Sequence, residues 1–337
     1  MRVAQSVQDI PPSGIRKFFD LASTMEGVIS LGVGEPDFVT PWRVREAVIS
    51  TLERGFTSYT GNSGTPELRR EISRYLFDRF AVDVRPEDEV LVTVGASEGI
   101  DLAIRAITDP GDEILLVEPC YVSYEPIIRL AGGVPVKIET TKATEFTLTP
   151  EHIRQAVTGK TKAIVFCYPS NPTGAVMDRK SFLEIAKVIR EHDLLAISDE
   201  IYAELNYTGK TVSFASLPGM KERTILLSGF SKAFAMTGWR IGYAAGPKDI
   251  IQAMTKIHQY TMLCAPITAQ MAAVEALKNG MDDVERMVES YRQRRNFLTR
   301  SFRRIGLESH EPKGAFYAFP NIESTGLTSE EVAEKLI

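Results

Sequence analysis

A single lysine lies among small and apolar residues in the stretch SGFSKAFAMTGWRIGY, which covers residues 228–243. This is Lys232, and Arg240 follows it eight positions later. Burying an ammonium group is costly unless its charge is paired or the group loses its proton. We therefore expect Lys232 to act chemically, as an amine that forms a Schiff base and transfers protons.

Other polar or small residues directly follow apolar runs of the sequence. Gly95, Ala96 and Ser97 follow VLVTV, Asp199 follows LLAIS, and Asn171 lies in YPSNPTG after AIVFC. Each has an ordinary structural interpretation: a strand-to-helix turn capped by Ser97, a capping aspartate, and an Asn-Pro turn. Each could also belong to a ligand site. For Gly95, Ala96 and Ser97 the reason is that backbone N–H groups at the start of a helix bind phosphate.

Taken together, these residues meet the requirements of a phosphorylated pyridine aldehyde. That ligand needs an amine, a carboxylate facing its ring nitrogen, a phosphate site and donors for its ring oxygen. The sequence offers, in that order, Lys232; Asp199; Gly95, Ala96 and Ser97 with Arg240; and Asn171 with Tyr202.

The elements that must position these residues form an alternating pattern. From residue 88 onward, short β-branched or apolar runs alternate with amphipathic stretches, which predicts a mainly parallel sheet covered by helices. Ligands bind at the carboxyl ends of the strands in such sheets. A long helix over 281–305 and a short strand at GAFYAFP (314–320) are expected to form a second, smaller domain with the N-terminal segment.

Composition and charge exclude several functions. The 337 residues are 44% hydrophobic and carry a formal net charge of −5. Acidic and basic residues are mixed along the sequence, which gives no basic cluster of the kind that binds nucleic acid. We expect no membrane association and a cytoplasmic location, because no apolar stretch suits a signal peptide or a membrane span. The three cysteines, Cys120, Cys167 and Cys264, are far apart, have no CxxC spacing and fit a reducing compartment. The four histidines have no metal-ligand spacing and are expected to be surface or packing residues: His152, His192, His258 and His310.

The chain resembles the class I/II aminotransferases of fold type I, which use pyridoxal 5′-phosphate. The resemblance runs from SGIRKF near the start to KGAFYAFP near the end, and GFSKAFAMTGWRIG is its most specific signature. It implies a three-layer α/β/α large domain over 41–282. An N-terminal arm over 1–40 and a smaller α+β domain over 283–337 would complete the fold.

The resemblance also implies roles for individual residues. Lys232 would carry the cofactor as an internal aldimine, Asp199 would pair with the pyridine nitrogen, and Tyr202 would contact the ring hydroxyl with Asn171. The remaining implied contacts are Tyr121 stacking on the ring, Arg240 on the phosphate, Tyr59 reaching the phosphate of a partner subunit in a homodimer, and Gly34 and Asn171 lining the substrate.

Two departures from the family pattern stand out. Gly229 replaces the phosphate-binding serine found in many relatives three residues before the lysine, and Ser231 is the expected substitute. The family's arginine for the substrate α-carboxylate, in a segment like GxGYxRLSF, has no counterpart before Ile337. The sequence is therefore expected to be a truncated form that binds the cofactor and transaminates poorly.

The predicted function is transfer of an amino group from an L-amino acid to a 2-oxo acid by ping-pong chemistry. Aspartate, aromatic and N-acetyl-diaminopimelate aminotransferases are the most similar subgroups. Two alternatives use the same fold: a carbon–sulfur lyase, which would release pyruvate without an added 2-oxo acid, and a cofactor-sensing transcription regulator, which would need a helix-turn-helix module before SLGVGEPDF.

Overall fold

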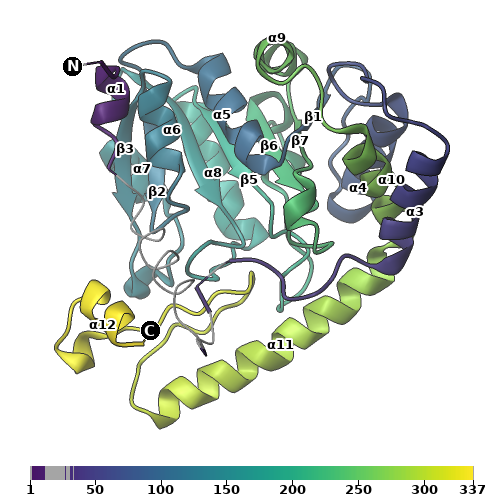
Figure 1. Ribbon diagram of the computed structural model, residues 1–337. Coiled ribbons are helices and arrows are strands. Elements are labelled where there is room, and N and C mark those ends of the chain that lie inside the picture. The colour runs from purple at the N-terminus through teal and green to yellow at the C-terminus, as the bar shows by residue number, and fades with distance from the viewer. Residues whose placement is uncertain (1, 12–26, 28–30, 33, 337) are drawn as a thin grey trace.

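A seven-stranded sheet forms the centre of the protein in a computed structural model that describes residues 2–11, 27, 31–32 and 34–336 (Figure 1). The strand order is β1-β7-β6-β5-β4-β2-β3, and only β7 runs antiparallel to its neighbours. The strands are β1 (Val90–Thr93), β2 (Glu113–Glu118), β3 (Val134–Glu139), β4 (Thr161–Cys167), β5 (Leu195–Asp199), β6 (Thr224–Gly229) and β7 (Gly242–Ala245). The predicted mainly parallel sheet is confirmed.

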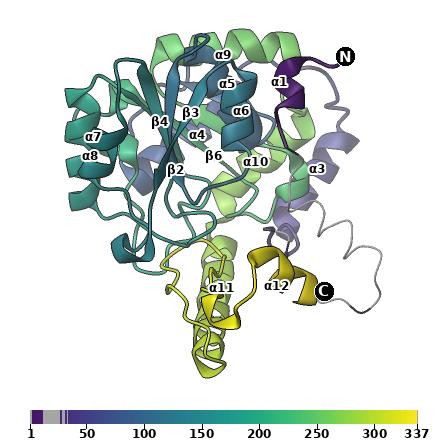
Figure 2. The ribbon, with the colours of Figure 1, turned by 90° about the vertical axis from the view of Figure 1, so that its left-hand side faces the viewer.

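Helices cover both faces of this sheet. Figure 2 shows α7 (Pro150–Ala156) and α8 (Arg179–Glu191) on one side of strands β2 and β4, with α6 (Tyr124–Leu130) on the other. The core divides accordingly, because Ile114 and Leu116 of β2 pack into one apolar cluster while Leu115 and Val117 pack into the other. The side-chain period of two along a strand produces this division, and the result is a three-layer arrangement.

Local signals set the ends of the covering helices. In α4 (Pro66–Phe80), the Thr65 side chain accepts a hydrogen bond from the backbone of Leu68, and a proline occupies the first helical position. In α8, Asp178 caps the helix by accepting from the Ser181 backbone at 2.7 Å. The other helices that surround the sheet are α1 (Gln5–Gln8), α3 (Trp42–Glu53), α5 (Ala96–Ile107), α9 (Lys248–Thr261) and α10 (Ile267–Asn279).

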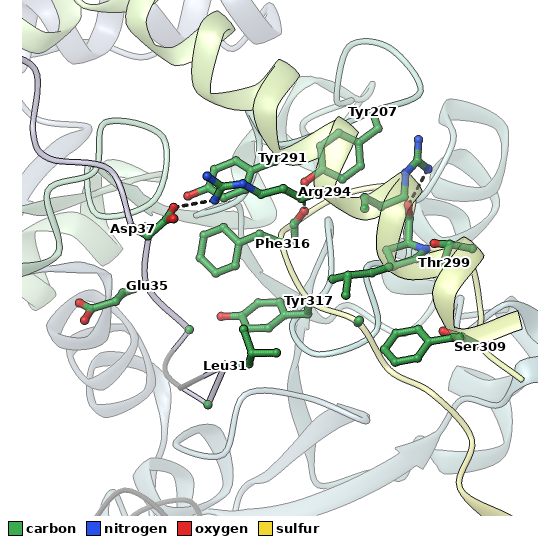
Figure 3. A pocket seen from close by; sticks show the side chains of 18 residues that line it. Leu31, Glu35, Asp37, Tyr207, Tyr291, Arg294, Thr299, Ser309, Phe316 and Tyr317 are labelled. Carbon is green, nitrogen blue, oxygen red and sulfur yellow. Dashed lines mark hydrogen bonds and ion pairs between the residues drawn. The ribbon is translucent and has the colours of Figure 1, made fainter. Parts of the chain in front are cut away.

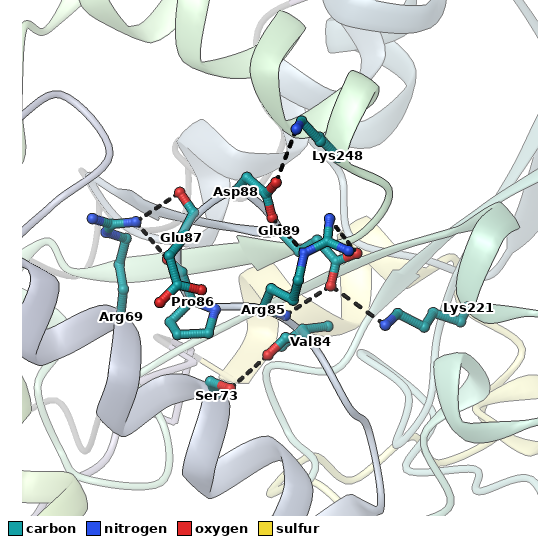
Figure 4. Close-up of polar contacts among 10 residues, drawn as sticks. All are labelled: Arg69, Ser73, Val84, Arg85, Pro86, Glu87, Asp88, Glu89, Lys221 and Lys248. Atoms are coloured by element: carbon teal, nitrogen blue, oxygen red, sulfur yellow. Dashed lines mark hydrogen bonds and ion pairs between the residues drawn. The ribbon is translucent and has the colours of Figure 1, made fainter.

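The turn that leads into β1 is held by charged side chains (Figure 4). Buried Glu89 accepts from the Arg85 backbone at 2.7 Å and pairs with Lys221 at 3.4 Å. Asp88 pairs with Lys248 of α9 at 3.1 Å. These contacts fix the entrance of the strand whose other end leads to Gly95.

Two helices of the C-terminal part lie outside the three central layers. Helix α11 (Met281–Arg304) extends along one side of the molecule, and α12 (Ser329–Leu336) lies near the C-terminus (Figure 1). None of the helices in the described ranges is long and apolar enough to span a membrane.

The predicted strand over 314–320 is wrong. The segment makes only isolated bridges, Asn206 with Gly314 and Ser309 with Pro320. Its backbone groups bond to loops instead of to a neighbouring strand, since the Ala315 N–H donates to the Leu205 carbonyl at 2.8 Å. An alternating sequence forms a strand only where a second strand is available to pair with it.

Candidate active site

The residues singled out in the sequence come from strand ends at one edge of the sheet. Strands β4, β5 and β6 run parallel, and β1 runs in the same direction because two antiparallel pairings through β7 separate it from β6. Asp199 ends β5, and Lys232 follows the end of β6 by three residues. The carboxyl edge of a parallel sheet is where ligand sites form in such folds.

Asp199 is a buried carboxylate with two hydrogen-bond donors. The Tyr124 hydroxyl donates to Oδ2 at 2.6 Å, and the Ile201 backbone N–H donates to Oδ1 at 3.1 Å. Burial raises the pKa of Asp199, while these two hydrogen bonds and the charge of Lys232 act to lower it. The bond to Ile201 shows that the aspartate also caps the following turn, so the structural and chemical interpretations coexist.

The Lys232 amine lies in a partly buried position close to Asp199. Its Nζ donates to the Gly34 carbonyl and lies 5.9 Å from the centre of the Tyr202 ring and 5.6 Å from that of Phe316. Burial lowers the pKa of Lys232, Glu35 opposes this, and Arg240 adds to it. A lysine with a lowered pKa holds a larger fraction of neutral amine, the form that attacks a carbonyl or accepts a proton.

The turn from β1 into α5 forms a concave backbone site beside Arg240. Gly95 is the N-cap with φ of 80°, and a Cβ added there would lie 2.8 Å from the Arg240 guanidinium. A Cβ added at Gly242 would lie 2.6 Å from the Ala96 nitrogen, so glycine is required at both positions. The first N–H groups of a helix have no intrahelical acceptor, and no side chain caps α5.

The expectation that Ser97 caps this helix is wrong. The N-cap is Gly95, and Ser97 lies exposed in the first turn, two residues inside the helix. The physical reason is that the backbone adopts a positive φ at Gly95, which ends the strand and starts the helix there. Donors of the backbone, with Arg240, remain available for an anion. Ser231 is buried next to Lys232.

Tyr202, Asn171 and Tyr121 come from segments next to Asp199 in the fold. Tyr202 is buried, and its hydroxyl shares a hydrogen bond of 2.5 Å with Tyr317. Asn171 follows β4, and Cys167 of β4 is paired in register with Asp199. Tyr121 is partly buried and contacts Tyr124 edge to face, with ring centres 5.6 Å apart.

Sequence reasoning missed two tyrosines of this site. Tyr124 lies in the quoted stretch EPCYVSYEP, three residues after Tyr121, and a helical period of three to four was the available signal for a shared face. Tyr317 had no such signal, because it comes from a segment 115 residues away from its partner Tyr202.

A cavity of about 300 Å³ adjoins the site between α11 and the segments 31–32 and 34–37 (Figure 3). Gly34 and Tyr317 belong to both the cavity lining and the Lys232 site. The figure shows Arg294 turned toward Asp37, at a distance of 2.6 Å. This ion pair connects the segment bearing Gly34 to helix α11.

The histidines do not form a metal site. Across the described ranges, no group of three His, Cys, Asp or Glu residues could hold a metal ion. His258 is fully buried, His192 is exposed, and His152 and His310 are partly exposed. The three cysteines are free thiols.

This geometry fits pyridoxal 5′-phosphate. The glycine-lined helix start with Arg240 suits a phosphate, buried Asp199 suits a protonated ring nitrogen, and Lys232 supplies the amine. The residue pattern that indicated this cofactor in the sequence is therefore assembled in one place by the fold.

Comparison with known proteins identifies the class. Residues 26–337 match the family described as aminotransferase class I and II, and the chain belongs to this family. The resemblance seen in the sequence is thus confirmed.

Individual proteins similar to this chain are also named as aminotransferases. The putative aminotransferase YugH of Bacillus subtilis is 59% identical over 331 residues, which cover 98% of this chain and 86% of YugH. Aromatic-amino-acid aminotransferase 2 of Thermococcus litoralis is 41% identical over 100% of this chain and 87% of its own length. The structure of Thermus thermophilus aspartate aminotransferase with maleate superposes with a TM-score of 0.94 at 38% identity, covering 99% of this chain and 89% of that one.

The protein is accordingly a pyridoxal-phosphate-dependent amino-acid aminotransferase with a fold-type I architecture. Its substrates are an amino acid and a 2-oxo acid. The comparisons give no support to the carbon–sulfur lyase alternative, and the relatives described here are aminotransferases.

Proposed function

We propose that Lys232 is the residue that binds the cofactor covalently and moves the substrate proton. The observation that carries this proposal is the position of its amine, partly buried within electrostatic reach of Asp199 and beside the Tyr202 ring. Burial lowers the pKa of Lys232, and a neutral amine at this point could take a proton from the substrate Cα and deliver it to the C4′ carbon of the cofactor.

Two groups of residues would hold the phosphate of the cofactor. Gly95, Ala96 and Ser97 offer backbone donors, and Ser231 and Arg240 offer side chains, for its phosphate. When bound, pyridoxal phosphate supplies an electron-accepting ring that stabilises the charge left at the substrate Cα.

The other side chains orient the ring. Asp199 would keep a proton on the ring nitrogen through its negative charge, and Tyr124 holds that carboxylate in place. Asn171 and Tyr202 would donate to the ring oxygen, and Tyr121 would cover one ring face. Gly34 and Asn171 would line the substrate, since the Gly34 carbonyl already contacts Lys232.

We further propose that the enzyme is a cytoplasmic homodimer with shared sites. Large apolar side chains are exposed together on α3, on the loop after it and at the end of α9. The Asn62 side chain donates to the Leu263 carbonyl at 2.8 Å, so the loop and the helix end lie side by side. The exposed members are Trp42, Ile49, Leu52, Phe56, Tyr59, Tyr260, Met262 and Leu263.

A partner subunit would cover this surface, because monomers rarely expose apolar patches of this kind. Tyr59 is 84% exposed, which suits a side chain that reaches the phosphate in the other subunit. The N-terminal arm over 1–40, the cofactor domain over 41–282 and the smaller domain over 283–337 remain our proposed division. The mass of the purified protein in solution tests the dimer.

Replacement of Lys232 tests the central assignment. Lys232→Ala is expected to abolish the visible absorbance of covalently bound cofactor and transamination, whereas Lys210→Ala, at an exposed lysine, should change neither. Amino donors assayed with 2-oxoglutarate, with pyruvate release recorded in its absence, separate transfer from elimination. If Lys232→Ala kept both absorbance and turnover, the assignment would be wrong.

A further inference from the structure

A buried pair of ionisable side chains lies directly behind the backbone turn at Gly95. His258 Nδ1 and Glu98 Oε1 are 2.7 Å apart, His258 is fully buried and Glu98 is nearly so. Glu98 belongs to the first turn of α5, and His258 belongs to α9. The proposed cofactor contacts include neither residue.

Glu98 fixes the conformation of the turn. Its second oxygen, Oε2, accepts from the Val94 backbone N–H at 2.5 Å, just before Gly95. A glutamate at the third helical position often reaches back to the chain preceding the helix, and here the bond spans the change from strand to helix. The Thr93 hydroxyl adds a bond to the Gly95 carbonyl at 2.9 Å.

The Glu98 carboxylate would repel a phosphate bound at the start of α5, and His258 is the side chain that pairs with it. A carboxylate in the first turn lies near the helix end where the phosphate would bind, and two negative charges in one place repel. The hydrogen bond between the His258 ring and Glu98 Oε1 pairs this carboxylate and orients it toward α9. The His258 Nε2 atom is buried and has no partner within the described ranges, so Glu98 is the group that holds the ring.

We propose that His258 is a positioning residue for the cofactor: together with Glu98 it fixes the Gly95 turn, and its hydrogen bond pairs a carboxylate that would otherwise oppose the phosphate. The inference rests on the proposed role of Gly95 and Arg240 as the phosphate site. It assigns His258 a function other than the packing role expected from the sequence.

The test measures cofactor affinity separately from turnover. Removing the cofactor from the holoenzyme and titrating it back into the apoenzyme, with protein fluorescence or cofactor absorbance as the signal, gives a dissociation constant. We expect His258→Leu to weaken binding by about tenfold, since it leaves an unpaired carboxylate near the helix end. The turnover number at saturating cofactor should change less than twofold, and inorganic phosphate should compete less well with the cofactor.

A second variant separates charge from folding. Glu98→Gln keeps an oxygen for the Val94 N–H and removes the charge, so in combination with His258→Leu it should restore most of the affinity. Met254→Ala, at a fully buried position of the same helix α9, is the matched control. It should lower the melting temperature without changing the dissociation constant.

The outcomes distinguish this inference from the proposed function. If His258→Leu lowers only the melting temperature, or if Glu98→Gln fails to restore affinity in the double variant, His258 has no positioning role. Arg240→Ala serves as the reference. If that substitution also leaves cofactor affinity unchanged, the phosphate site itself has been misplaced.

Discussion

Replacing Glu200 by glutamine is expected to remove a pH-dependent part of the protein's stability. Glu200 is 3% exposed and directly follows Asp199. One of its oxygens, Oε1, accepts from the hydroxyls of Ser198 and Ser213, each at 2.9 Å, and from the Phe214 backbone at 3.1 Å. Burial nevertheless dominates and raises the pKa of Glu200 from 4.5 to about 7.

The sign of the effect follows from this raised pKa. Between pH 4.5 and 7 the folded protein holds a proton on Glu200 that the unfolded chain has lost. The stabilisation from Glu200 is therefore complete below pH 4.5, the pKa of this group in the unfolded chain. It disappears as the pH rises through about 7, the pKa of Glu200 in the folded protein. A shift of 2.5 units, the difference between 4.5 and about 7, corresponds to about 3 kcal/mol, of which roughly 2.5 kcal/mol is lost between pH 5 and 8.

Urea unfolding of the apoenzyme at several pH values between 5 and 8 measures this contribution. The glutamine of Glu200→Gln cannot ionise and keeps an oxygen for the same three donors. Between pH 5 and 8 the free energy of unfolding of this variant should therefore fall by roughly 2.5 kcal/mol less than that of the wild type. Glu53→Gln, at an exposed position on α3, is the control and should follow the wild-type protein. Equal pH dependence in Glu200→Gln and the wild type would refute the reasoning.

Two further substitutions test the environment of the cofactor ring. Asp199→Asn is expected to keep the cofactor bound through its phosphate while lowering the turnover number by about 10²–10³-fold, because a fixed charge opposite the ring nitrogen is lost. Steady-state kinetics at saturating cofactor measure this effect, and an unchanged turnover number would contradict it. Tyr124→Phe removes the 2.6 Å hydrogen bond to Asp199. It should lower the free energy of unfolding by about 1.5–3 kcal/mol, measured with urea, and an unchanged free energy of unfolding would contradict a stabilising role for this bond.

The sequence determined the chemistry and most of the sheet. Lys232, Asp199 and the glycine-rich turn at Gly95 could be identified because they follow apolar runs that must be buried strands, and parallel strands present their carboxyl ends at one edge. Two strands were not identified: β3 is an edge strand whose residues are mostly exposed or partly exposed, so it lacks an apolar run, and β7 has only four residues.

The tertiary structure decided which distant groups support that chemistry. Tyr317 meets Tyr202 across 115 residues, and His258 meets Glu98 across 160. No periodicity links such positions, because the contact depends on how α5, α9 and the loops pack after the sheet has formed. The strand expected over 314–320 fails for the same reason: pairing depends on a neighbour, which only the folded chain provides or withholds.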